Sequence, residues 1–264
     1  MTSRIRHVAV LALACVFLLR CAGDVAAAPF SDQELIRGFL GTVFGAERQS
    51  GTRDRAAAGQ VKKFVGPIGY HIISTSRVDR VGTVRRFMSS LEAAVQNLSL
   101  YEERDPTYAR LMIYLVDRAD YGRTIRTTVW DGVDTGFLEM NACSAVLAAR
   151  PSGIERAHVY LVADEGFAGL SHCLVEEVAQ SLGPANDDLS LADSIFNDQS
   201  ELNAFGLFDW YILNMLYDSR VAPGMTMEEV RPLLPAIIQS VRASLPQVLG
   251  DDTAGLAHHS AYRR

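Results

Sequence analysis

The chain has 264 residues, of which 48% are hydrophobic and 21% are charged, a composition typical of one large globular domain or two small ones. Its net charge is −6, and an acidic chain is a poor partner for nucleic acid or for an anionic membrane surface. We therefore exclude both classes of partner.

The N-terminal segment has the three parts of a secretory signal. Two arginines precede an apolar run over residues 8–19, and three alanines stand before Pro29 as small residues for cleavage. The apolar run is too short to span a bilayer, although an uncleaved anchor is the alternative. We expect residues 1–28 to be removed and the mature protein to be secreted or periplasmic, with no transmembrane span after cleavage.

Cleavage of the signal would leave two cysteines, Cys143 and Cys173. Two thiols in an exported protein favour one disulfide, and two buried free thiols are the alternative. The bridge would close a loop of about 30 residues and stabilise the fold by roughly 3 kcal/mol on the chain-entropy model.

Helix and strand patterns alternate through the first half of the mature chain. Apolar residues at helical spacing predict helices over residues 31–44 and 83–98, separated by a polar loop and by one or two strands around Pro67. Further strands are predicted at 110–116, at 137–149 around Cys143 and at 154–163. Residues 117–136 have poor periodicity, which predicts an extended insertion or an irregular strand.

A helix of about three turns is predicted over residues 172–182. Ser171 can cap its start, and Gly183 followed by Pro184 supplies its end. Apolar residues form one stripe along it, and its polar residues gather on the opposite face, as Glu176, Glu177 and Gln180.

The rest of the chain is predicted to be mainly helical. A loop rich in Asp, Asn and Ser over 187–201 leads to an apolar core helix at 204–217. After the turn at 223–225, Thr226 and Glu229 form a capping box that begins a helix, which Pro235 should kink or split. Residues 250–264 are predicted to be a disordered tail. No linker divides residues 29–249, so we expect a single domain.

The predicted site helix resembles the zinc-binding motif of the metzincin metallopeptidases, H-E-x-x-H-x-x-G-x-x-H. This sequence reads Glu176-Glu177-x-x-Gln180-x-x-Gly183-x-x-Asn186, so the spacing is kept and every histidine is replaced. Pro223-Gly224-Met225 stands where a metzincin has its Met-turn. With Asp187 and the runs at 194–198 and 216–218, the pattern is similar to a family of exported bacterial proteins of unknown function.

The resemblance implies an α+β, zincin-like fold. In such a fold a twisted mixed β-sheet packs on helices, and the site helix lies beneath an edge strand. Residues 29–249 would form one zincin-like domain, and Met225 would pack beneath Glu176 and Gln180.

The replaced residues change the metal chemistry that the frame can support. Glu176, Gln180 and Asn186 offer one carboxylate and two amides, and neutral amides are poor zinc ligands. An all-oxygen set suits calcium better, with Asp187, Asp188 and Asp193 as further candidates. The cofactor therefore stays open, with calcium favoured over zinc. The alternative is that these residues form only a solvated helix face and a solvated loop.

Glu177 stands at the position of the metzincin general base, with Glu176 as its partner or as a ligand. If the two carboxyl groups are buried together, repulsion and desolvation favour the acid–base chemistry that hydrolysis needs. His172-Cys173 is a weaker candidate for a thiol site, because adjacent residues on a helix point about 100° apart.

Two functions follow from the resemblance. The first is a degenerate metallopeptidase-like fold that binds a peptide or an envelope protein without zinc and without turnover. The alternative is a peptidase-like hydrolase that uses Glu177 as its base, with an unconventional metal or none. The lost ligands favour the binding module, because zinc would supply both a Lewis acid and an activated water.

Overall fold

A computed structural model describes residues 29–44, 59–129, 133–192, 194–197, 199–200 and 202–249. The predicted signal segment, most of the polar loop before residue 59, and the predicted tail lie outside these ranges.

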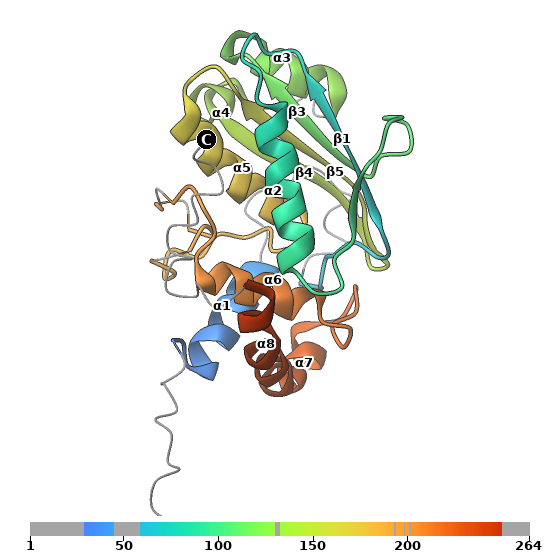
Figure 1. Cartoon of the computed structure of the whole chain (residues 1–264), viewed down its shortest axis with the longest axis vertical. Helices are drawn as coiled ribbons and strands as arrows, with labels where there is room; N and C mark the ends of the chain where they lie inside the picture. Colours follow the sequence, from blue (N-terminus) through green and yellow to red (C-terminus); the bar gives the residue numbers. More distant parts are fainter. Residues whose placement is uncertain are drawn as a thin grey trace, which may run out of the picture. The chain divides into compact units, whose positions relative to one another are not determined.

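The core of the fold is one five-stranded sheet with the order β2-β1-β3-β5-β4 (Figure 1). Neighbouring strands are parallel except for β4, which runs antiparallel to β5 at one edge. The expected mixed sheet is confirmed, and it is mostly parallel. The strands are β1 (Ile68–Ser74), β2 (Leu100–Glu102), β3 (Leu111–Val116), β4 (Cys143–Arg150) and β5 (Gly153–Val162).

Both faces of the sheet are covered, which explains why every residue of the central strand β3 is buried. On β4 the neighbours Cys143 and Ser144 point to opposite faces, because side chains alternate along a strand. Cys143 is bonded to the helix α5 (Phe167–Ser181), whereas Ser144 accepts a hydrogen bond from Tyr121 of α3 (Arg118–Thr128). The helices α5 and α3 therefore lie on opposite faces.

The prediction of an irregular extended segment over residues 117–136 is wrong. This region forms α3, and α4 (Thr135–Met140) follows, so the strand predicted from residue 137 begins only at Cys143. The α3 sequence is rich in Arg and Thr, which hide its periodicity, and only Tyr121 and Ile125 are buried on it. Those two residues join a buried cluster on the sheet that includes Tyr114 and Tyr160.

The predicted strand around Pro67 is also shorter than expected, because only β1 forms. Residues before it run beside the turn at 223–225 instead: the Val61 amide donates to the Met225 carbonyl at 2.8 Å, and the Gly224 amide donates to the Val61 carbonyl at 2.9 Å. Gly66 has φ +71° and Pro67 has no N–H, so the chain cannot continue a ladder there.

The remaining helices confirm the mainly helical C-terminal part (Figure 1). The capping box of Thr226 and Glu229 is present. The following helix is divided at a 3₁₀ turn, Arg231–Leu233, which contains Pro232, so the split precedes the predicted Pro235. The C-terminal helices are α6 (Leu207–Tyr217), α7 (Met227–Val230) and α8 (Leu234–Leu249). The two other helices, α1 (Asp32–Phe44) and α2 (Val81–Ala94), belong to the first half of the chain.

The predicted disulfide is confirmed. Cys143 and Cys173 are bonded across 30 residues of sequence, with their Cα atoms 5.6 Å apart. The bond joins the antiparallel edge strand β4 to α5, so the helix that carries the candidate site is tied directly to the sheet.

Candidate functional site

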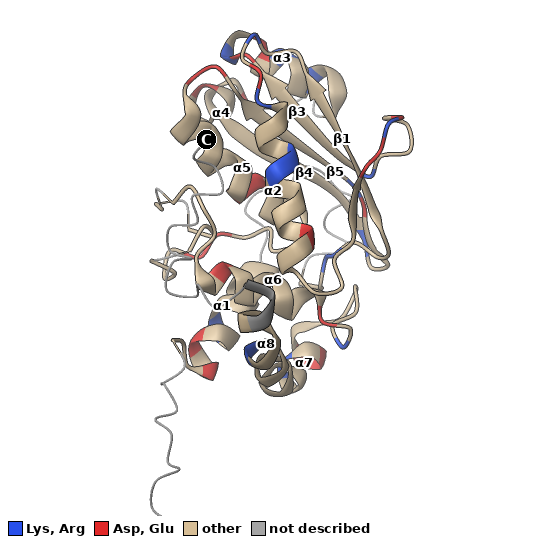
Figure 2. Cartoon of the chain, viewed as in Figure 1, with Lys and Arg blue, Asp and Glu red and all other residues tan. Residues whose placement is uncertain are grey.

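The site helix α5 is longer than predicted and is buried over most of its length. It begins at Phe167 after Gly166, so Ser171 is an interior, buried residue and not the cap. Phe167 and Leu170 extend the apolar stripe by one turn, which moves the start of the helix. The adjacent Glu176 and Glu177 are its only Asp, Glu, Lys or Arg residues, so α5 carries red and no blue in Figure 2.

The polar residues of α5 do not form a solvated face. Glu177 is 8% exposed and Gln180 is 7% exposed, and the side chain of Glu176 is 12% exposed. Polar groups that are buried to this extent need hydrogen-bond partners, because losing water without compensation is costly. The alternative that Glu176, Glu177 and Gln180 form only a solvated helix face is therefore wrong.

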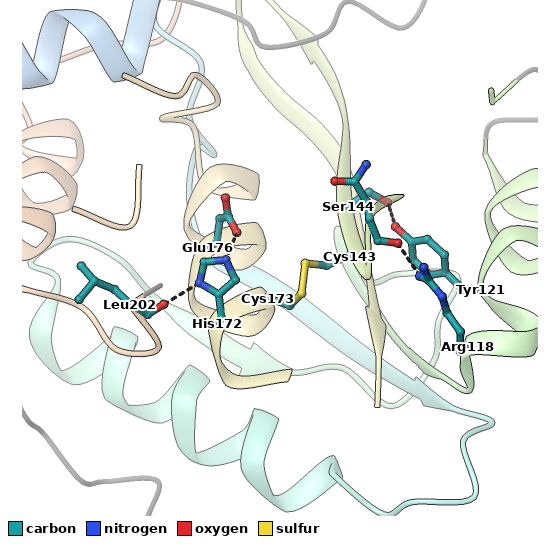
Figure 3. The surroundings of a disulfide bond; sticks show 9 residues. Arg118, Tyr121, Cys143, Ser144, His172, Cys173, Glu176 and Leu202 are labelled. Atoms are coloured by element: carbon teal, nitrogen blue, oxygen red, sulfur yellow. Dashed lines mark hydrogen bonds and ion pairs between the residues drawn. A yellow bond between two sulfur atoms is a disulfide. The ribbon is translucent and has the colours of Figure 1, made fainter. Parts of the chain in front are cut away.

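His172 and Glu176 are joined one helical turn apart. The Nδ1 atom of His172 lies 2.6 Å from the Leu202 carbonyl, and its Nε2 lies 3.1 Å from Oε2 of Glu176 (Figure 3). A carbonyl can only accept, so Nδ1 carries a proton. The contact between Nε2 and Oε2 of Glu176 is an ion pair when the imidazole is protonated on both nitrogens.

Gln180 continues this arrangement one turn farther along α5. Its Nε2 donates to the carboxylate of Asp187 at 3.1 and 3.4 Å. His172, Glu176 and Gln180 stand four residues apart on one face of the helix. We call these three residues, together with Asp187, the polar row.

Gly183 makes the turn that returns the chain to Gln180. It has φ +138°, and a Cβ atom there would lie 2.1 Å from the Lys62 carbonyl oxygen. Only glycine fits this combination of conformation and close approach. The turn at Gly183 brings Asp187 back to the side chain of Gln180.

Asn186, predicted as a site residue, is placed elsewhere. Its side chain donates to the Gly41 carbonyl at 2.8 Å, and its amide donates to the Thr42 carbonyl at 3.2 Å. Asn186 therefore holds the turn against α1, while its neighbour Asp187 meets Gln180.

The side chains of Glu176 and Glu177 face different surroundings, because consecutive side chains on a helix point about 100° apart. Glu176 faces His172, as Figure 3 shows. The pKa of Tyr121, on the other face of the sheet, is raised chiefly by burial, lowered by the Ser144 hydrogen bond and raised by the charge of Glu177. The two side chains thus leave α5 in different directions, and their role as a catalytic pair stays a prediction.

Met225 lies in the predicted turn. Its sulfur accepts from the Ala222 amide at 3.1 Å, within the same turn, and its carbonyl pairs with Val61. These contacts hold the turn against the chain before β1, and packing beneath Glu176 and Gln180 stays a prediction.

The donor set does not fit a zinc ion. The amide nitrogen of Gln180 is committed to Asp187 as a donor, and Glu176 is paired with His172. Over the described ranges, no three His, Cys, Asp or Glu side chains converge on a point that would hold a metal. Of the proposed calcium ligands, Asp188 accepts from the amide and hydroxyl of Ser190, and Asp193 lies outside the described residues.

The sequence-based prediction missed His172 as a member of the site. The signal was present, because His172, Glu176 and Gln180 are spaced i, i+4, i+8 and must share a helix face. The partner of His172 could not be found this way, since the Leu202 carbonyl is a backbone group 30 residues away.

The sheet, the disulfide-bonded helix and the polar row define a mixed α/β protein with a buried polar site on one helix. Within this class, the chain belongs to the family described as "Protein of unknown function (DUF2927)", whose model matches residues 32–236. The match includes the whole sheet and the polar row. No curated protein and no solved structure matches the chain. Across the described residues, no helix combines the length and apolar character needed to cross a membrane.

Proposed function

We propose that this protein is an exported binding module with a degenerate, zincin-like frame. Its polar row would bind a peptide or a segment of an envelope protein without zinc and without turnover. The signal-like N-terminal sequence supports export, and the disulfide suits an oxidising compartment.

One observation carries the proposal. The positions that the metzincin motif reserves for zinc ligands are occupied by groups that hydrogen-bond within the protein, Glu176 with His172 and Gln180 with Asp187. A bound peptide would compete for these donors and acceptors, which are of the kinds that recognise a polar backbone. It lacks the imidazole ligands with which zinc would polarise a carbonyl.

The architecture supports the zincin-like frame. The resemblance implies that the site helix lies beneath an edge strand of a mixed sheet, and the disulfide joins α5 to the antiparallel edge strand β4. The glycine turn at Gly183 and the helical C-terminal part are further points of agreement.

The alternative is a hydrolase in which Glu177 acts as general base. Its burial favours this role, because a desolvated carboxylate is a stronger base. Its direction from α5, about 100° from that of Glu176, argues against it, since a base and its substrate-binding groups must address the same atom.

The test is a selection of random peptides on the mature protein, residues 29–264, followed by calorimetry with the selected peptides. We expect Gln180→Ala to weaken binding by about 10-fold, the effect of losing one hydrogen bond of about 1.4 kcal/mol. Arg85→Ala is the matched control, because Arg85 is exposed and pairs with Glu102 at the far edge of the sheet. Its affinity should equal that of the wild type.

The same peptides, incubated with the protein and followed by mass spectrometry, separate the two functions. Intact peptides agree with a binding module. Cleavage that survives a chelator and is abolished by Glu177→Gln would overturn it in favour of the hydrolase.

A further inference from the structure

The two edges of the sheet differ in length and in charge. One edge is β2, which has three residues and carries Glu102 in an ion pair with Arg85 at 2.7 Å. The other is β4, which has eight residues, no proline, and Arg150 at its end as its only charged residue. Short length, charge and proline are the usual protections of an edge strand against pairing with another chain. The edge at β2 has the first two, whereas β4 has none of them before the bulge that follows Ala148.

The backbone groups on the outer side of β4 follow from its pairing with β5. The Ala142 carbonyl accepts from the Val162 amide at 2.9 Å, so residue 142 directs its backbone groups towards β5. Alternate residues of an antiparallel strand face the partner strand, so the next residue and every second one after it face outwards. These outward residues are Cys143, Ala145 and Leu147. Within the part of the chain that the structure describes, their outward N–H and C=O groups have no hydrogen-bond partner.

The side chains of the same stretch are small or apolar and only partly covered. Ala145, Val146 and Leu147 are half-buried, and Ala148 is exposed. A strand added at this edge would bury apolar surface and would also give the outward backbone groups their partners. Backbone and side chains therefore favour the same event.

We propose that β4 pairs with β4 of a second copy of this chain, in antiparallel orientation about a two-fold axis at Ala145, so that the two sheets join into one. This register sets Ala145 opposite its own copy and Cys143 opposite Leu147, so every outward residue meets another outward residue. Each such pair exchanges two hydrogen bonds between N–H and C=O groups. The pairing goes beyond the proposed function and does not depend on what the polar row binds.

The strand fits itself, which favours a second copy as the occupant. The bulge between Ala148 and Ala149 ends the regular stretch, and a centre at Ala145 uses the outward residues that precede it. The two Arg150 residues then lie at opposite ends of the paired strands, so no like charges are brought together. Each chain has one edge of this kind, so the assembly closes as a dimer and leaves only the short, charged β2 edges free.

Sedimentation equilibrium of the mature protein over a series of concentrations tests this proposal. We expect a reversible dimer that Ala145→Pro weakens by about 30-fold or more, because each copy loses the N–H of the central pair. The fold should tolerate this proline, since the lost N–H faces away from β5. Ala145→Ser is the matched control: it keeps the N–H at the same position, and its dimer should be as stable as that of the wild type. A wild type that stays monomeric at every concentration, or equal weakening by the two variants, overturns the proposal.

Hydrogen exchange, followed residue by residue by NMR, keeps the test valid if Ala145→Pro does not fold. As the concentration of the wild type rises, the amides of Cys143, Ala145 and Leu147 should become protected. The amides of Ser144 and Val146 should not change, because they face β5. Protection that is independent of concentration contradicts pairing between copies. Protection that appears only after a foreign peptide is added also overturns the proposal, because it assigns the edge to that peptide.

Discussion

At the scale of single residues, the question is which polar side chains the end of α5 and the following turn bring together. Gln180 meets Asp187, whereas Asn186 is turned towards Gly41. The motif spacing alone selects Asn186 as the third position, but the backbone after Gly183 brings Asp187 to Gln180.

We predict that the triple variant Glu176→His, Gln180→His, Asp187→His binds zinc. The corresponding variant with Asn186→His in place of Asp187→His should bind it more weakly, because the third imidazole is directed at α1. The loss should exceed the roughly 10- to 100-fold cost of removing an outer partner. Competition with a chromogenic chelator measures both affinities; equal affinities would show that the third position is not Asp187.

Gly183 is the second residue of interest, because adding a Cβ atom there should lower the stability of the protein. Gly183→Ala should destabilise the protein by about 3 kcal/mol or more, because it combines a disfavoured φ with a collision against the Lys62 carbonyl. Gly66→Ala is the matched control, with φ +71° and open space around the added Cβ, and should cost about 1 kcal/mol. Urea unfolding measures both; similar losses would mean that the close approach relaxes without cost.

At the scale of elements, the disulfide between Cys143 of β4 and Cys173 of α5 ties the site helix to the sheet. The double variant Cys143→Ser, Cys173→Ser should lose about 3.5 kcal/mol of unfolding free energy, the chain-entropy value for a separation of 30 residues. Urea unfolding with and without reductant provides the measurement. If reductant lowers the unfolding free energy of the double variant as much as that of the wild type, the loss does not come from the disulfide.

The same scale shows where periodicity fails as a guide. The helix α5 was predicted because its apolar residues follow the helical period. The strand β3 was predicted because it is a short, continuous run of apolar residues, as expected of a strand with both faces buried. The helix α3 buries only Tyr121 and Ile125, and its exposed Arg and Thr residues carry no helical signal. Its helical state is decided by the sheet face against which those two residues pack.

At the scale of the whole molecule, the burial of Asp209 should set the dependence of stability on pH. Its pKa is raised from 3.8 to about 7 in the folded protein, so the folded state binds more protons between these values. Stability attributable to Asp209 therefore falls as the pH rises from about 4 to 7, by on the order of 4 kcal/mol at most.

Thermal unfolding of the wild type and of Asp209→Asn, measured from pH 4.5 to pH 7.5, tests this dependence. The difference in Tm between the two proteins should change steadily in favour of the variant as the pH rises, because the amide never pays for a buried charge. A difference that does not vary with pH would contradict a proton held by Asp209.

The sequence by itself determined the elements with strong local signals: the helices at α1 and α5, the strands β3 and β5, the Thr226 capping box and the pairing of Cys143 with Cys173. Each depends on the period of apolar residues, on a cap, or on having only one possible partner. Only the tertiary structure decided that α5 is buried on its polar side and that Asp187, not Asn186, meets Gln180. It also decided that His172 meets the Leu202 carbonyl and that Asp209 accepts from Ser194. Those contacts join backbone and side-chain groups that are distant in sequence, and no local pattern encodes the partner of a backbone carbonyl.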